Sequence, residues 1–192
     1  MIKTNYHSHS SFCDGEGRLE DYVQYALSKH MEAFGFSGHA PLPFPNAWTM
    51  DEEDIPQYLG EIQRLKDLYR GRIELYGGME IDYIDDTHNP AHPNYDALGL
   101  YFRIGSVHML PDPDTGAYFG VDGPVEEIEH LIKSVYQGSV EKMVTDYYLR
   151  LQRMIKIGGF DFIGHIDLIK KHNRGLSLFS EDESWYRDLV VR

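Results

Sequence analysis

Two histidines stand one residue apart near the start of the chain, in residues 5–14, "NYHSHSSFCD". Imidazole nitrogens are common ligands of transition-metal ions, and two imidazoles that face the same way can bind one ion. In an extended strand, residues i and i+2 lie on one face, roughly 6.5 to 7 Å apart. If residues 4–9 form a strand, His7 and His9 could therefore share an ion. The alternative is that they are two exposed polar residues.

Four more β-like runs carry a potential ligand at or near their ends. The runs are residues 33–39, 73–83, 102–110 and 160–168, and their potential ligands are His39, Glu80, His108 and His165. A single histidine at the end of a strand is usually a rim residue. Five histidines at equivalent ends, together with Glu80 and Asp14, instead favour a metal centre.

Helical patterns separate these β-like runs. Apolar residues recur at spacings of three and four within residues 19–27 and 55–69, and a longer helical region covers residues 125–157, with a break near Gly138 and Ser139. Alternating strands and helices are typical of a parallel sheet. In parallel barrels the active site lies at the carboxyl ends of the strands, where the potential ligands stand here.

The composition limits the classes of function. The 192 residues contain no apolar run long enough to suggest a membrane span, and the formal charge of −13 argues against broad binding to a nucleic acid backbone. The only cysteine, Cys13, has no partner for an internal disulfide, and the first residues do not resemble a signal peptide. We therefore expect a cytoplasmic protein with no nucleic acid or membrane partner. The oligomeric state stays open.

Five motifs in this chain resemble the polymerase and histidinol phosphatase (PHP) superfamily, specifically its histidinol phosphatases. They are "HSHSSFCDG", "FSGHAPLP", "GMEIDYI", "GSVHML" and "FIGHIDLIKKHN". The resemblance implies an α/β fold, a distorted (β/α)7 TIM-like barrel, and metal-dependent hydrolysis of a small phosphate monoester, most closely L-histidinol phosphate. Two alternatives are a PHP phosphoesterase with another small substrate and a non-catalytic metal-binding domain.

The resemblance also implies which residues bind metal. There are seven, namely His7, His9, Asp14, His39, Glu80, His108 and His165. The first ion would take the two opening histidines and Glu80, which would bridge to a second ion held by His108 and His165. Asp14 and His39 would hold a third. Glu80, His108 and His165 are the expected catalytic residues. Nitrogen and oxygen ligands suit Zn²⁺ first, or Mn²⁺ or Fe²⁺, with up to three ions in a complete site.

The substrate is expected to meet cationic and aromatic side chains. Arg150 lies at the edge of an apolar helical stripe, with Arg153 further into the polar face, and either guanidinium could bind phosphate. Tyr118 and Phe119 lie in the loop that follows the fourth β-like run, where they could pack on an imidazole ring. The alternative is that both arginines are solvated and that the aromatic residues only anchor the loop.

One feature of the family is missing from this sequence. Histidinol phosphatases carry a further Asp-x-His after two more βα units, and no such motif follows residue 173 here. We therefore expect a single PHP phosphoesterase domain over residues 1–192 that lacks its last two βα units and has an open sheet edge. A natural short variant is the alternative. With only Asp14 and His39 for the third ion, the chain should bind fewer than three ions tightly.

Overall fold

The computed structural model describes residues 3–191, which form two compact units. Unit 1 comprises the residues up to Asp82, Thr87–Gly105 and Gly159–Ile163. Unit 2 comprises Tyr83–Asp86, Ser106–Gly158 and the residues from Gly164 onward. None of the described helices is both long and apolar enough to cross a bilayer.

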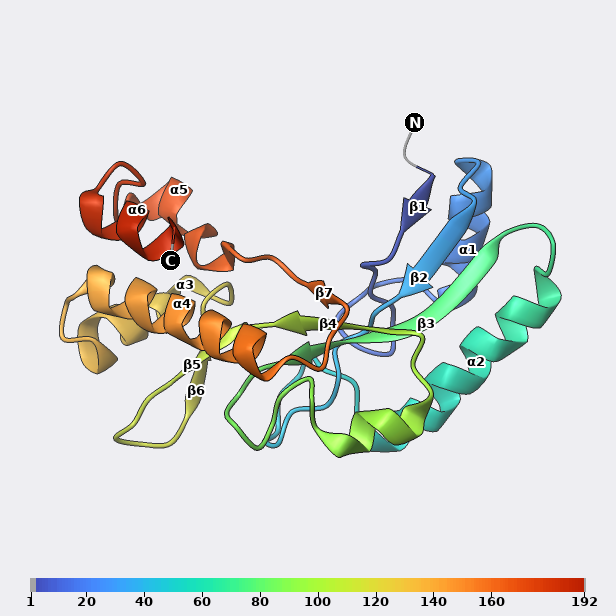
Figure 1. The fold of residues 1–192 in the computed structure, drawn as a ribbon, viewed down its shortest axis with the longest axis horizontal. Helices are drawn as coiled ribbons and strands as arrows, with labels where there is room; N and C mark the ends of the chain where they lie inside the picture. Colours follow the sequence, from blue (N-terminus) through green and yellow to red (C-terminus); the bar gives the residue numbers. More distant parts are fainter. Residues whose placement is uncertain (1–2, 192) are drawn as a thin grey trace. The chain divides into compact units, whose positions relative to one another are not determined.

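Unit 1 contains a parallel sheet whose strand order is β1-β2-β3-β4-β7, so β1 and β7 are its edges (Figure 1). The strands are β1 (Thr4–Asn5), β2 (Ala33–Phe36), β3 (Glu74–Asp82), β4 (Phe102–Ser106, whose last residue belongs to unit 2) and β7 (Phe162–Ile163). Strands of this sheet that follow one another in the chain lie side by side, which is the order of a (β/α) barrel.

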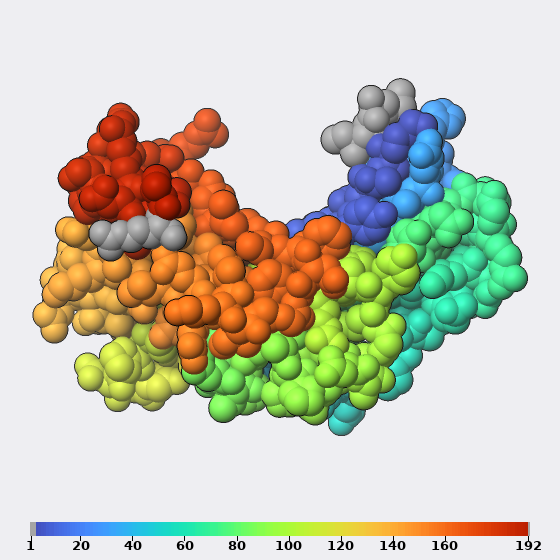
Figure 2. Space-filling model, viewed as in Figure 1, coloured from blue at the N-terminus to red at the C-terminus, as the bar shows by residue number. Residues whose placement is uncertain are grey.

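Two helices pack against the sheet of unit 1. They are α1 (Leu19–Ser28) and α2 (Ile55–Leu68), and both follow the predicted apolar spacing. Each buries one stripe of side chains, and α2 forms part of the outer surface of unit 1 (Figure 2). Short 3₁₀ helices, η1 (Glu52–Asp54) and η2 (Pro93–Leu98), lie in the connections after β2 and β3. The helices thus cover one face of the strands whose ends carry the potential ligands.

Unit 2 is mainly helical, with one hairpin made of β5 (Met109–Pro111) and β6 (Tyr118–Gly120). Its helices are α3 (Val125–His130), the π-helical turn η3 (Leu131–Val135), α4 (Val140–Ile157), η4 (Leu168–Lys170), α5 (Asn173–Leu176) and α6 (Ser184–Val191). The predicted break is confirmed, since Gly138 has a φ of +84° and Ser139 caps α4 by accepting the Lys142 N–H at 3.2 Å.

Four of the predicted strands are too long. For the run 33–39, strand β2 ends at Phe36, with a single isolated bridge further on at His39. Strand β1 ends at Asn5, and the run 102–110 is wrong as a single strand because residues 109–111 leave the sheet to pair antiparallel with β6. The run 160–168 forms strand only at Phe162–Ile163, and its last residue begins a 3₁₀ helix. Local β propensity therefore marked the right places, but tertiary pairing set the lengths.

Candidate metal centre

The opening histidines lie beyond β1, so a regular strand does not position them. Ser8, between them, is bound to the end of β2 instead. Its backbone N–H donates to Ser37 Oγ at 3.1 Å, its carbonyl accepts the Ser37 N–H at 2.9 Å, and its hydroxyl donates to the Gly35 carbonyl at 2.8 Å. These bonds hold the segment against β2, while the imidazole rings of His7 and His9 face Glu80 on β3.

Glu80 is the centre of the cluster in unit 1. Its side chain is 0% exposed, and three histidine nitrogens surround Oε2: His7 Nε2 at 2.9 Å, His9 Nε2 at 3.2 Å and His39 Nδ1 at 3.5 Å. His39 follows β2 and is joined to Glu80 by a parallel bridge between the two backbones. The parallel sheet therefore brings together residues from three of the predicted strand ends.

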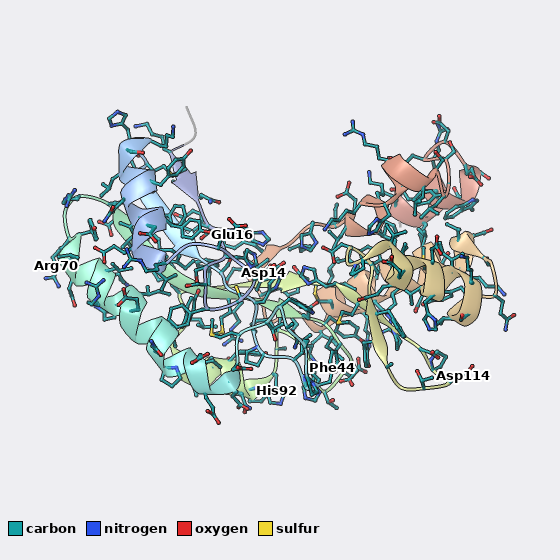
Figure 3. All side chains as sticks on the ribbon, turned by 180° about the vertical axis from the view of Figure 1, so that it is seen from behind. Asp14, Glu16, Phe44, Arg70, His92 and Asp114 are labelled. Atoms are coloured by element: carbon teal, nitrogen blue, oxygen red, sulfur yellow. The ribbon has the colours of Figure 1, made fainter. Side chains whose placement is uncertain are left out.

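Asp14 completes the cluster from the loop between β1 and α1 (Figure 3). Its carboxylate lies 3.2 Å from His9 Nδ1 and 3.7 Å from His39 Nε2. His9 thus has Glu80 at one ring nitrogen and Asp14 at the other. Two sets of ligand atoms converge within 4.8 Å and could each hold an ion: His7, His9 and Glu80, and then His9, Asp14 and His39.

A tight loop brings Asp14 back to His9. The N–H groups of Cys13 and Gly15 both donate to the Ser10 carbonyl, at 2.9 and 3.1 Å. A Cβ on Gly15 would lie 2.4 Å from the Ser10 backbone nitrogen, closer than real Cβ contacts come. Only glycine fits this position without a shift of the backbone.

Gly15→Ala should lower the free energy of unfolding by about 2 kcal/mol or more, because the loop must open to admit the methyl group. Urea unfolding measures the change. Gly60→Ala is the matched control, since Gly60 is an exposed residue within α2 with open space at its Cβ, and we expect a gain of about 0.5–1 kcal/mol there. Equal effects of the two substitutions would contradict the close fit at Gly15.

The charges in the cluster fit a divalent cation. Burial lowers the pKa of His9, but hydrogen bonds to Cys13 and Glu80 and the charge of Glu80 outweigh burial and raise it to about 10. A fully buried carboxylate needs positive charge beside it, from protonated imidazoles or from a metal ion bound to neutral ones. Every donor in the two sets is a nitrogen or a carboxylate oxygen, which suits Zn²⁺, Mn²⁺ or Fe²⁺.

The remaining predicted ligands, His108 and His165, form a pair in unit 2. Their Nε2 atoms lie 3.0 Å apart and their rings meet edge to face, with centroids 4.7 Å apart. The Tyr147 hydroxyl donates to the His165 carbonyl at 3.1 Å, which ties the short segment after β7 to α4. Two imidazole nitrogens at this distance can turn toward one ion. The predicted bridging by Glu80 stays a prediction.

The predicted substrate residues all lie in unit 2. The half-buried Arg150 donates to the Ile84 carbonyl and to Asp146, both at 3.3 Å, whereas Arg153 binds both carboxylate oxygens of Asp86. Tyr118 and Phe119 lie on β6, and the Phe119 ring packs on the imidazole of His130 at 4.3 Å. His130 is not a predicted ligand. The roles of these four residues in binding a substrate stay predictions.

Two further side chains lie against the cluster. The Trp48 ring meets the His39 imidazole edge to face at 4.7 Å, and Cys13 Sγ lies 3.6 Å from His9 Nδ1. Burial raises the pKa of Cys13, but bonds from His9 and backbone groups outweigh burial and lower it. Trp48 lies in the proline-rich loop after β2, nine residues beyond His39, and no local pattern pointed to it.

Comparison with known proteins decides the family. The PHP domain matches residues 5–192, which is nearly the whole chain. The chain belongs to the PHP family. A histidinol-phosphatase of Bacillus subtilis is 31% identical to it over 186 residues, covering 89% of this chain and 68% of that protein. A Deinococcus radiodurans protein named "Probable histidinol-phosphatase" is 30% identical over 171 residues, covering 86% of this chain and 60% of that protein. The predicted membership of the PHP histidinol phosphatase family is confirmed.

Solved structures support the fold of this PHP chain. A crystal structure from Listeria monocytogenes, of a protein described as a candidate histidinol phosphatase, has a TM-score of 0.77 at 22% identity and covers 98% of this chain and 78% of its own. The histidinol phosphate phosphatase of Lactococcus lactis, crystallised with zinc, L-histidinol and phosphate, has a TM-score of 0.68 at 23% identity, over 88% of this chain and 59% of its own. The predicted fold class, an incomplete TIM-like α/β barrel, is confirmed.

Proposed function

We propose that this protein is a metal-dependent phosphoric monoester hydrolase whose substrate is L-histidinol phosphate. The observation that carries the proposal is the buried Glu80 carboxylate with the nitrogens of His7, His9 and His39 within 3.5 Å. The names of the curated relatives, and the zinc, histidinol and phosphate bound by the Lactococcus lactis enzyme, support it. The chain spans 60 to 68% of the first two relatives, so the activity of the whole protein is part of the proposal.

The residues of the cluster would bind the metal ions in two groups. Glu80, His7 and His9 would hold one ion through the first set of ligand atoms, and Asp14 and His39 would hold another with the second nitrogen of His9 beside them. When bound, divalent ions neutralise phosphate oxygens and lower the pKa of a water molecule from about 15.7 toward 7. We propose Zn²⁺ as the most suitable ion, with Mn²⁺ and Fe²⁺ as alternatives and up to three ions in a complete site.

His108 and His165 would supply a further pair of ligands from unit 2. Their mutual distance of 3.0 Å and the bond that fixes the His165 backbone to Tyr147 support this role. In the PHP resemblance these histidines and Glu80 are the catalytic residues. Their part is to keep the metal ions in place, since no side chain is needed as a nucleophile when a water molecule is activated.

Recognition of the substrate phosphate is proposed for Arg150 ahead of Arg153. Arg150 is half-buried and makes one bond to a carboxylate oxygen, whereas Arg153 is more exposed and already occupied by both oxygens of Asp86. A guanidinium that retains donors can bind a phosphate in the same forked geometry. Tyr118 and Phe119 are proposed to contact the organic part of the substrate.

We also propose that the protein acts in the cytoplasm.

The test is phosphate release from L-histidinol phosphate. Protein stripped of metal with a chelator should be inactive, and activity should return when Zn²⁺ or Mn²⁺ is added. Several other phosphate monoesters, tested at the same concentration, should be hydrolysed more slowly. Bound metal without any hydrolysis would contradict the reaction, and faster hydrolysis of another ester would contradict the substrate.

A further inference from the structure

The end of β2 and the middle of β3 keep one register up to the cluster. Phe36 pairs with Gly77, and His39 pairs with Glu80, three residues further along each strand. The backbone bonds at the cluster are regular: the Glu80 N–H donates to the Gly38 carbonyl at 3.1 Å, and the Ala40 N–H donates to the Glu80 carbonyl at 2.8 Å. In a parallel ladder such bonds alternate between the strands. The same alternation places the Gly38 N–H opposite the Gly78 carbonyl.

A side chain occupies that position of the ladder. The Gly38 N–H donates to the Tyr58 hydroxyl at 3.2 Å, and the hydroxyl donates to the Gly78 carbonyl at 2.9 Å. One direct bond between the strands is thus replaced by two bonds in series through a phenol oxygen. Tyr58 lies on α2 and is 0% exposed, so no water competes for these bonds. Burial raises the pKa of its hydroxyl, which therefore keeps the proton that it donates.

The inserted hydroxyl changes the spacing of the two strands. A direct ladder bond brings nitrogen and oxygen to about 2.9 Å, whereas two bonds meeting at one oxygen separate them by roughly 5 Å. Direct bonding resumes immediately afterwards, at the pair formed by His39 and Glu80. The spread of the strands therefore ends where the cluster begins, next to His39 and Glu80.

We propose that Tyr58 is a positioning residue whose hydroxyl, placed in the β2–β3 ladder, sets the geometry of His39 and Glu80 for metal binding. The part that concerns metal rests on the proposed function. Tyr58 lies 19 residues from His39 and 22 from Glu80 in the sequence, on the helix that connects their strands. The helix thereby supplies both an apolar face for the core and one polar group for the ladder.

The test is Tyr58→Phe, which keeps the ring in its packing and removes only the hydroxyl. Tyr69→Phe is the matched control: Tyr69 directly follows α2, is also buried, and donates its hydroxyl to Glu20 at 3.0 Å, outside the cluster. Each change removes one phenol hydroxyl and its hydrogen bonds, so each should lower Tm by roughly a few degrees. The zinc Kd, measured by competition with a chelator, should rise about tenfold or more for Tyr58→Phe and stay unchanged for Tyr69→Phe.

Crystal structures of the metal-free wild type and Tyr58→Phe give a readout that does not depend on metal. In the variant we expect the Gly38 N–H to bond directly to the Gly78 carbonyl, with the distance from His39 Nδ1 to Glu80 Oε2 moved from 3.5 Å. An unchanged strand spacing, or a zinc Kd equal to that of Tyr69→Phe, would overturn the proposal, even if the variant had a much lower Tm. Wild-type protein that binds no zinc would count against the proposed function, while the two structures would still decide the role of the hydroxyl.

Discussion

Glu80→Gln is expected to lower kcat for phosphate release from L-histidinol phosphate by roughly 10³-fold. Glutamine keeps the shape of the side chain but removes the charge that faces His7, His9 and His39 within 3.5 Å. A neutral amide binds a divalent ion far more weakly than a carboxylate does, so the ion and the water that it activates would both be lost. Steady-state kinetics with saturating Zn²⁺ measure the effect.

Glu74→Gln is the matched control for this change. Glu74 is the first residue of the same strand, β3, and it is exposed. Its replacement should leave kcat within about twofold of the wild type, since a surface charge at this distance is screened by salt. Normal turnover by Glu80→Gln would rule out the proposed role of this carboxylate.

The double substitution of His7→Ala and His9→Ala should remove one tightly bound ion. A structural zinc site with four ligands is worth about 10–16 kcal/mol, so each lost ligand should weaken binding by roughly 10²-fold or more. His9 stands in both ligand sets, and its loss should therefore weaken the second set as well. Metal content after dialysis, measured by plasma mass spectrometry, gives the number of ions retained.

His88→Ala with His92→Ala is a matched control, because these two histidines also lie close together, with ring centroids 6.2 Å apart, but belong to neither ligand set in unit 1. This pair lines a pocket of about 260 Å³ between the loops after β2 and β3. The control should keep the metal content of the wild type. A full complement of metal in the His7 and His9 double variant would mean that the opening motif does not bind metal.

Much of the architecture could be predicted from local patterns. The apolar spacing of three and four residues predicted α1, α2 and α4, because a helix that covers a sheet must present one apolar stripe. The cluster residues of unit 1 could be expected to meet because the carboxyl ends of parallel strands lie at one edge of a sheet. His39 and Glu80 illustrate this, since 41 residues separate them in the sequence and a parallel bridge joins them in the fold.

The types of residue and their order along the chain were thus enough to predict a parallel α/β sheet and the candidate ligands of unit 1, since both follow from periodicity and from the chemistry of the side chains, whereas the barrel was implied by the family resemblance. How those ligands are held depended on contacts between distant residues, which leave no local pattern. Ser8 is anchored to Ser37 where a strand was expected, and Tyr58 takes one position of the β2–β3 ladder. A hydroxyl finds such a partner only after helix and sheet have packed, because burial excludes the water that would otherwise satisfy it.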